Sequence, residues 1–329
     1  MIPDQWYAIL ESHEVPRDRP VGMVRLGEKL VFWRDSQGHV VCQRDKCAHR
    51  GAALSKGKVV GDCVECPFHA LQYDSAGRCQ LIPANGQVSE VPERFQIRTY
   101  PSQEAHGFIW LWWGEGRTDL PPLPWFEDID GSFAHATFRD HWPVHYSRAI
   151  ENQLDMAHVP FVHHNTIGRG GRTVVDGPVV KLADDRILIW VYNRKDDGTP
   201  ARRPADLPEP ERPAMLHFHF ANVWQNRIQD DMRVVVAFAP IDESNTLLYV
   251  RYYQRFVRLP VLRWLVCQGG NIGSRVITAQ DKRVVTTQDP KKSGIAIGEK
   301  LFPADRPIVA YRQRRQELID QAENTATSE

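Results

Sequence analysis

Two groups of histidine, cysteine and carboxylate side chains have the types and spacing of metal ligands. The first lies between Glu151 and His164, where Asp155, His158 and His163 offer one carboxylate and two imidazoles within nine positions. Two neutral imidazoles and one carboxylate can hold Fe(II) on one face and leave the other face open to oxygen and a substrate. We interpret the segment as part of an iron site whose third ligand comes from elsewhere in the sequence.

The spacing of these residues limits how the segment can fold. On a helix Asp155 and His158 share a face, whereas His158 and His163 point roughly 140° from each other at about 3.6 residues per turn. Pro160 cannot donate its amide hydrogen and disturbs a helix, so we expect it to let His163 turn back toward the metal. A helix end with ordinary core or surface histidines is the alternative for this segment taken alone.

The second group consists of Cys47 and His49, then sixteen residues, then Cys66 and His69. Two cysteines and two histidines on two short loops are the ligands of a Rieske [2Fe-2S] cluster, in which two imidazoles replace two thiolates on one iron. A structural zinc site is the competing interpretation, because Cys2His2 also suits tetrahedral zinc.

Short strands separated by turns are expected from the N-terminus to about residue 113, which indicates a small all-β unit. A linker rich in glycine, charge and proline follows at 114–124, and we place the domain boundary at residue 118. The strands expected in the first domain are 6–10, 22–26, 29–33, 40–43, 95–98 and 107–113.

The second domain, 119–329, is expected to contain strands followed by two helices. In one strand His217 and His219 alternate with two phenylalanines, which fits either a pocket wall or ordinary half-buried sheet. The loop 196–213 is rich in proline and is either a lid or a surface excursion. The expected strands are 133–140, 178–182, 186–192, 215–224, 232–241 and 246–256, and the expected helices are 260–288 and 305–322.

The third iron ligand is expected on the first of these helices. Residues 271–288 have the apolar spacing of an amphipathic helix that carries one acid, Asp281. Asp289 is the alternative, which Pro290 disfavours because it marks the end of the helix.

Composition restricts the partners. Lys plus Arg equals Asp plus Glu at 41 each, so nothing favours nucleic acid or an anionic membrane, and a neutral small molecule fits better. The N-terminus has no basic region followed by an apolar run, and no segment reaches about 18 apolar residues. We therefore expect a cytoplasmic protein.

The two constellations together resemble the Rieske non-haem iron oxygenases over nearly the whole chain. The resemblance is to the terminal oxygenase (alpha) component of the monooxygenase- and demethylase-like homotrimeric branch, in which the segment around Asp281 supplies the carboxylate ligand. One departure is Ala70-Leu71, where family members often have Gly-Trp. The resemblance implies an α+β fold, with an all-β Rieske domain followed by a helix-grip catalytic domain containing an antiparallel sheet.

The resemblance also implies the role of each site residue. Asp155 would bridge His158 and the cluster histidine His69 of an adjacent subunit, which requires a ring of at least three subunits. Asn152 would lie near the iron, although a structural amide fits equally well. The implied cluster ligands are Cys47, His49, Cys66 and His69, and the implied iron ligands are His158, His163 and Asp281.

The implied reaction uses O2 and electrons from a separate NAD(P)H-dependent reductase, through a ferredoxin or flavin reductase, because the chain has no nucleotide-binding glycine motif. The enzyme would hydroxylate or oxidatively demethylate a small aromatic or heterocyclic molecule. Three alternatives stay open: a ring cis-dihydroxylating dioxygenase alpha subunit, an electron-transfer Rieske protein with a non-catalytic ligand-binding domain, and a zinc-stabilised binding module.

Overall fold

The computed structural model describes residues 1–183 and 185–328. Its contacts divide the chain into two compact units, Pro3–Leu123 and a second unit from Pro124 onward. The division falls among the prolines of the linker, a few residues beyond the expected position 118. Among the described residues, no helix combines the length and the apolar character that crossing a membrane requires.

The first unit is built from three small antiparallel sheets. One has the strand order β1-β11-β10, the second β2-β3-β4-β9 and the third β5-β6-β7-β8. The strands are β1 (Gln5–Glu11), β2 (Val21–Arg25), β3 (Glu28–Arg34), β4 (Val40–Arg44), β5 (Lys58–Val60), β6 (Cys63–Glu65), β7 (Gln72–Asp74), β8 (Cys79–Leu81), β9 (Thr99–Tyr100), β10 (Ser102–Ala105) and β11 (Phe108–Trp113).

The third of these sheets was not expected from the sequence. Its strands have only three residues each, which is too short for a period-two pattern to be recognised. The expected strand at 95–98 is wrong, because only Gln96 forms a bridge, to Arg78, and β9 begins at Thr99.

The second unit contains one seven-stranded antiparallel sheet with the order β12-β18-β17-β16-β15-β14-β13. The strand expected at 215–224 is two strands, β15 and β16, separated by a turn at 220–222. The strands are β12 (Ala134–Trp142), β13 (Val174–Ala183), β14 (Arg186–Arg194), β15 (Leu216–His219), β16 (Val223–Gln229), β17 (Met232–Pro240) and β18 (Thr246–Gln254).

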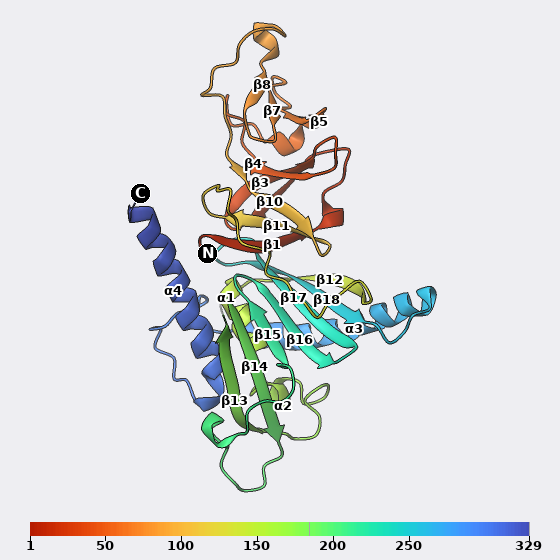
Figure 1. Ribbon diagram of the computed structural model, residues 1–329, viewed down its shortest axis with the longest axis vertical. Coiled ribbons are helices and arrows are strands. Elements are labelled where there is room, and N and C mark those ends of the chain that lie inside the picture. The colour runs from red at the N-terminus through yellow and green to blue at the C-terminus, as the bar shows by residue number, and fades with distance from the viewer. Residues whose placement is uncertain (184, 329) are drawn as a thin grey trace. The chain divides into compact units, whose positions relative to one another are not determined.

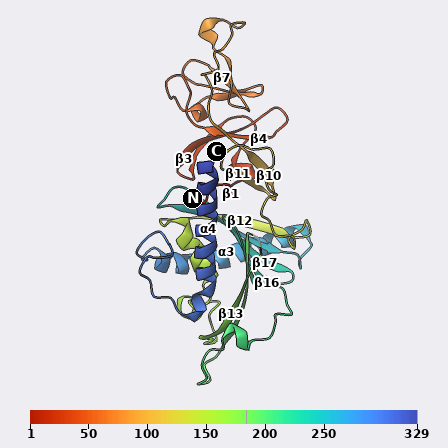
Figure 2. The ribbon, with the colours of Figure 1, turned by 60° about the vertical axis from the view of Figure 1, so that its left-hand side comes forward.

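Four helices accompany this sheet: α1 (Tyr146–Leu154), α2 (Val159–Val162), α3 (Pro260–Val285) and α4 (Arg306–Ser328). Helix α3 packs against β12 and β18, and α4 packs against β13 and β14 (Figure 1). In Figure 2 the dark-blue helix α4 passes in front of α3. An antiparallel sheet that holds a long helix confirms the expected α+β class and helix-grip architecture.

Candidate active site

The histidine-bearing segment consists of two short helices rather than one. The break falls at Asp155, whose backbone is extended, so the expectation that Pro160 interrupts the helix is wrong. Pro160 lies in the first turn of α2, where a missing amide hydrogen is tolerated. His158 and His163 flank α2 at its two ends. Gly168 closes the following turn, where its N–H donates to the His163 carbonyl oxygen (3.0 Å) and a Cβ would collide with the backbone of α2.

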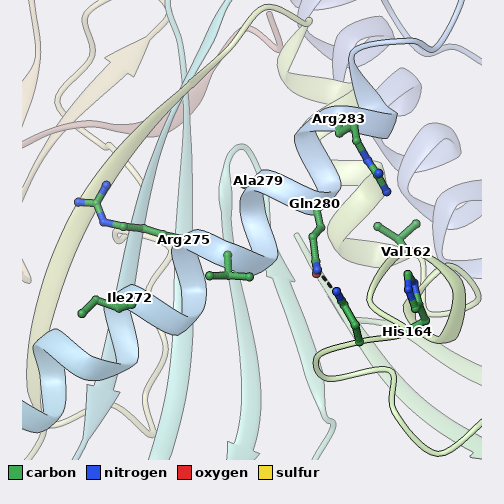
Figure 3. A pocket seen from close by; sticks show the side chains of 9 residues that line it. Val162, His164, Ile272, Arg275, Ala279, Gln280 and Arg283 are labelled. Carbon is green, nitrogen blue, oxygen red and sulfur yellow. Dashed lines mark hydrogen bonds between the residues drawn. The ribbon is translucent and has the colours of Figure 1, made fainter.

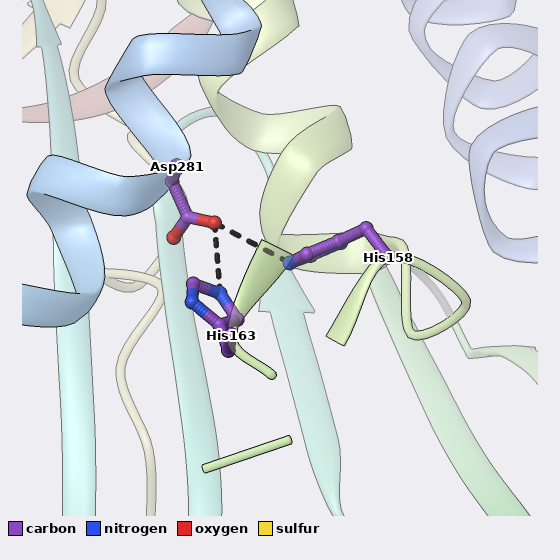
Figure 4. Close-up of side chains that lie close together, drawn as sticks. All are labelled: His158, His163 and Asp281. Carbon is purple, nitrogen blue, oxygen red and sulfur yellow. Dashed lines mark ion pairs between the residues drawn. The ribbon is translucent and has the colours of Figure 1, made fainter. Parts of the chain in front are cut away.

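The side chains of His158, His163 and Asp281 converge on one point (Figure 4). Asp281 Oδ1 lies 2.9 Å from His163 Nε2 and 3.4 Å from His158 Nε2. One ligand atom from each residue lies within 4.8 Å of the other two. Asp289, the alternative third ligand, is exposed and does not belong to this group. The three residues expected to bind iron are therefore brought together from two distant parts of the chain.

Gln280 is a site residue that the sequence pattern does not reveal. Its Oε1 lies 2.8 Å from His163 Nδ1. Because an amide oxygen can only accept, His163 Nδ1 carries the proton and its Nε2 presents a lone pair to the shared point. Thr166 Oγ1 donates to Gln280 Oε1, and Gln280 Nε2 donates to Asn165 Oδ1, so the amide itself is fixed. Figure 3 shows Gln280 pointing from α3 toward the loop that follows His164.

Neighbouring side chains also support the other two members of the group. Asp155 Oδ2 lies 3.3 Å from His158 Nδ1, and Asp155 Oδ1 accepts a hydrogen bond from the Ala157 N–H (2.7 Å). Gln153 Nε2 donates to Asp281 Oδ2 (3.4 Å). His163 Nδ1 and Asp281 Oδ2 are thus hydrogen-bonded to neighbours and Asp155 lies beside His158 Nδ1, as is usual for residues that bind a metal.

This donor set fits an iron ion. Asp281 Oδ1 is buried without a hydrogen-bond donor, and it faces the nitrogen of two imidazoles. Converging lone pairs repel one another unless a cation lies between them, and two imidazoles with one carboxylate suit non-haem Fe(II). A proton is the alternative cation: burial lowers the pKa of His158, but the carboxylates of Asp155 and Asp281 outweigh burial and raise it to about 9. Burial raises the pKa of Asp281, yet the two histidines bring it below its ordinary value.

A cavity of about 490 Å³ opens beside this group. Its floor is the sheet, where two rows of cross-strand neighbours lie side by side. One row is Trp224, Val236 and Val250, and the other is Asn226, Val234 and Tyr252. Apart from Asn226 these side chains are apolar or aromatic, so the sheet gives the cavity a largely apolar floor.

Helix α3 forms the opposite wall of the cavity. The lining positions recur every three or four residues and therefore lie on one face of the helix. Gly270 lets the helix approach the sheet closely, because a Cβ at this position would collide with the Tyr252 ring. Asn152 of α1 also lines the cavity, and its buried Nδ2 has no hydrogen-bond partner in the described part of the chain. The lining positions of α3 are Gly270, Gly273, Ser274, Ile277, Thr278 and Asp281.

Two sequence features do not contribute to this cavity. His217 and His219 are not among its lining residues, whereas the alternating Phe218 and Phe220 pack against Tyr311 of α4. The strand is therefore not a wall of this cavity, and it also lacks an exposed face, because His219 is 6% exposed and packs edge-on against Phe126. The loop expected at 196–213 lines a separate hollow with its residues from Pro208 onward.

In the first unit the two cysteine- and histidine-bearing loops share one backbone construction. In each loop the cysteine N–H donates to the carbonyl oxygen of the residue five positions later. The cysteine carbonyl oxygen accepts from the N–H of the residue four positions later, and all four N···O distances are 2.8–3.0 Å. This fourth residue is left-handed in both loops, with φ +74° at Gly51 and +56° at Ala70. An alanine in this conformation is strained by roughly 1 kcal/mol, whereas a glycine adopts it readily.

The four candidate cluster ligands divide into a buried pair and an exposed pair. Cys47 and Cys66 are 2% and 1% exposed, and burial raises the pKa of the Cys66 thiol. Tyr73 Oη lies 3.2 Å from Cys47 Sγ. His49 and His69 are exposed, with ring centroids 4.8 Å apart. Two inner thiols and two outer imidazoles suit a cluster whose histidine-bound iron lies at the protein surface.

Comparison with known proteins places both units in characterised families. Residues 5–101 match the Rieske [2Fe-2S] domain, and residues 142–321 match the vanillate O-demethylase oxygenase C-terminal domain. Protein TIC 55 from Arabidopsis thaliana is 32% identical over 257 residues, which are 76% of this chain and 46% of that protein. The chain spans about half or less of the length of the first curated relatives that it matches.

Solved structures agree on the fold. NdmA from Pseudomonas putida CBB5, solved with caffeine as a QL mutant, has a TM-score of 0.75 at 21% identity, covering 98% of this chain and 92% of NdmA. Dicamba monooxygenase bound to dicamba has a TM-score of 0.73 at 18% identity, covering 100% and 99% of the two chains. With a match to the Rieske domain followed by a match to the vanillate O-demethylase oxygenase C-terminal domain, the chain belongs to the Rieske non-haem iron oxygenases, which carry a [2Fe-2S] cluster and a mononuclear iron.

Proposed function

We propose that the protein is a terminal oxygenase that uses O2, and electrons from a separate NAD(P)H-dependent reductase, to hydroxylate or oxidatively demethylate a small organic molecule. The observation that carries this proposal is the position of the candidate iron ligands. His158, His163 and Asp281 lie at the wall of an apolar cavity, so a molecule in the cavity would lie next to the metal.

In this proposal His158, His163 and Asp281 hold Fe(II), and Cys47, His49, Cys66 and His69 hold the [2Fe-2S] cluster. The iron supplies oxygen activation when it is bound, and the cluster supplies single electrons. The protein's own contribution is orientation. Gln280 keeps the proton of His163 on Nδ1, Asp155 holds His158, and the apolar cavity floor excludes water from the substrate.

The cavity lining indicates an uncharged substrate. Its described residues include the carboxylates of Asp155 and Asp281 and no lysine or arginine. A carboxylate or sulfonate in the cavity would therefore be desolvated without a cationic partner, which is costly. Asn226 and Ser274 provide polar groups on opposite walls. We infer a neutral, flat aromatic or heterocyclic molecule, with N- or O-methyl compounds as candidates for demethylation.

Electron delivery is proposed to cross between subunits of a homotrimer. His69 is exposed in the first unit, and Asp155 lies beside His158 in the second unit. An adjacent subunit that presents His69 to Asp155 would complete a path from cluster to iron, with the carboxylate orienting an imidazole on each side. Each subunit would then pass electrons to the next one in a closed ring.

The test is anaerobic reconstitution with Fe(II), a reductase and NADH, followed by measurement of oxygen uptake with a panel of compounds. The panel pairs each neutral aromatic, heterocyclic or methylated compound with its carboxylate or sulfonate analogue. We expect product-coupled uptake with neutral members, with formaldehyde marking demethylation. A cis-diol product would favour the ring dioxygenase alternative. Reduction of the cluster with no substrate-dependent uptake would favour an electron-transfer protein, and a preference for anions would refute the inference from the cavity.

A further inference from the structure

The first turns of α3 carry an unusual exposed apolar surface. Leu259, Val261, Leu262, Trp264 and Leu265 are 69%, 74%, 47%, 60% and 51% exposed. Figure 1 shows these turns of α3 extending past the edge of the sheet. Contiguous apolar side chains of this size on a protein surface indicate a binding surface. We call these five residues the α3 apolar surface.

Helix geometry places the apolar side chains of these turns on one side of α3. At about 100° per residue, the side chains of Val261, Leu262, Trp264 and Leu265 cover an arc of roughly 160°. Cys267 points away from that arc and is buried, with its Sγ near Gln254. Residues 260–265 are exposed on every side, with Arg263 opposite the apolar arc, and α3 begins to pack on its own domain at Val266 and Cys267.

The same side of α3 stays apolar and basic further along. Ile272 and Val276, which are 65% and 47% exposed, continue it at helical spacing. They line a groove of about 560 Å³ together with Arg275 and Arg283 (Figure 3). Among the described residues that line the groove there is no carboxylate.

The segment that contains the α3 apolar surface carries an excess of basic residues. The sequence has no acid between Glu243 and Asp281, and Asp281 is buried at the iron site. Arg258, Arg263 and Arg275 are exposed within this interval. The zero net charge of the whole chain, which argued against an anionic membrane as a partner, conceals this local excess of positive charge.

We propose that the α3 apolar surface docks in the plane of an anionic lipid membrane, with its apolar side chains among the acyl chains and its arginines among the lipid phosphates. Tryptophan and arginine suit such an interface, because each joins an apolar body to a polar end. An amphipathic helix with a basic flank lies in the interface and does not cross it. Two copies joined symmetrically through this surface would bring its arginines together, because residues 244–280 contain no acid.

The test is co-sedimentation of the iron-loaded protein with vesicles of phosphatidylcholine alone and with roughly 30% phosphatidylglycerol added, at about 0.15 M salt. We expect binding to the anionic vesicles that exceeds binding to the neutral ones at least about tenfold. The double substitution Trp264→Ser with Leu265→Ser removes exposed apolar side chains and should abolish binding. Arg258→Gln with Arg263→Gln should weaken it and reduce its dependence on salt.

The matched control is Leu182→Ser with Leu301→Ser, which removes two leucines that are 51% and 43% exposed elsewhere in the domain. We expect the control to bind vesicles like the wild type. The proposal is overturned if the wild type does not sediment with anionic vesicles, or if the control loses as much binding as the α3 variant. It is also overturned if sedimentation velocity shows that the α3 variant breaks the assembly, because the surface would then be a contact between copies.

Discussion

Replacement of Gln280 by methionine tests how the protein orients its iron ligands. Methionine has a similar length, but its thioether sulfur is only a weak acceptor for the proton on His163 Nδ1, which lies 2.8 Å from Gln280 Oε1. His163 is then free to rotate or to change tautomer, and either change moves its lone pair away from the shared point. Loss of such a supporting hydrogen bond weakens metal binding about 10- to 100-fold, which corresponds to roughly 1.4 to 2.8 kcal/mol.

The assay is anaerobic competition for Fe(II) between the protein and a coloured chelator. The visible absorbance of the [2Fe-2S] cluster serves as an internal measure of intact protein. Gln268→Met is the matched control, because Gln268 lies on the same helix and does not line the cavity. An Fe(II) dissociation constant for Gln280→Met within about twofold of the wild-type value would refute the assigned role of Gln280.

Three further predictions follow from the second unit. Asp155→Asn should keep both metals but lose most turnover, because the amide oxygen can still accept a hydrogen bond from His158 but lacks the charge of the proposed bridge to His69 of an adjacent subunit. Wild-type single-turnover rates with full iron content would contradict this. Burial, together with the nearby Arg186, lowers the pKa of His219 to about 3, so the folded protein binds fewer protons than the unfolded chain below about pH 6.5, and stability falls as the pH decreases. At pH 5 the destabilisation from His219 amounts to roughly 2 kcal/mol. The free energy of unfolding in urea should therefore fall less between pH 7 and pH 5 in His219→Gln than in the wild type, by about that amount. An equal fall in both proteins would disprove the role of His219. Gly270→Ala should push the Tyr252 ring aside, at a cost of about 1 to 3 kcal/mol in unfolding free energy, and should raise the KM of any substrate. If the unfolding free energy and the KM both stay unchanged, the close contact between Gly270 and Tyr252 does not constrain the cavity.

The three residues proposed to bind iron could be singled out from the sequence because chemistry restricts metal ligands strongly. Asp281 is the single acid on an amphipathic helix, and two histidines without a third ligand required one. Gln280 could not be found in this way, since adjacent helical residues usually face different directions and a glutamine has no metal-site signature. Only the loop carrying Thr166, folded against α3, makes Gln280 part of the site.

The parts that sequence could not predict depend on short elements and on register. The break in the histidine segment occurs at Asp155 rather than Pro160 because a carboxylate that accepts the Ala157 N–H stabilises a turn there. The cavity floor depends on which residues of β16, β17 and β18 are paired, and periodicity alone does not fix a strand register.

The chain is proposed to hold two different iron centres, and iron quantitation of the wild type and of two single variants tests this. The wild type should contain about three iron atoms per chain, two in the cluster and one mononuclear. His158→Ala should contain about two and keep the electron paramagnetic resonance signal of the reduced cluster, while His164→Ala, which alters the adjacent exposed histidine, should keep all three. Zinc in place of iron in the wild type, or full iron content in His158→Ala, would contradict the assignment of two iron centres to these ligands.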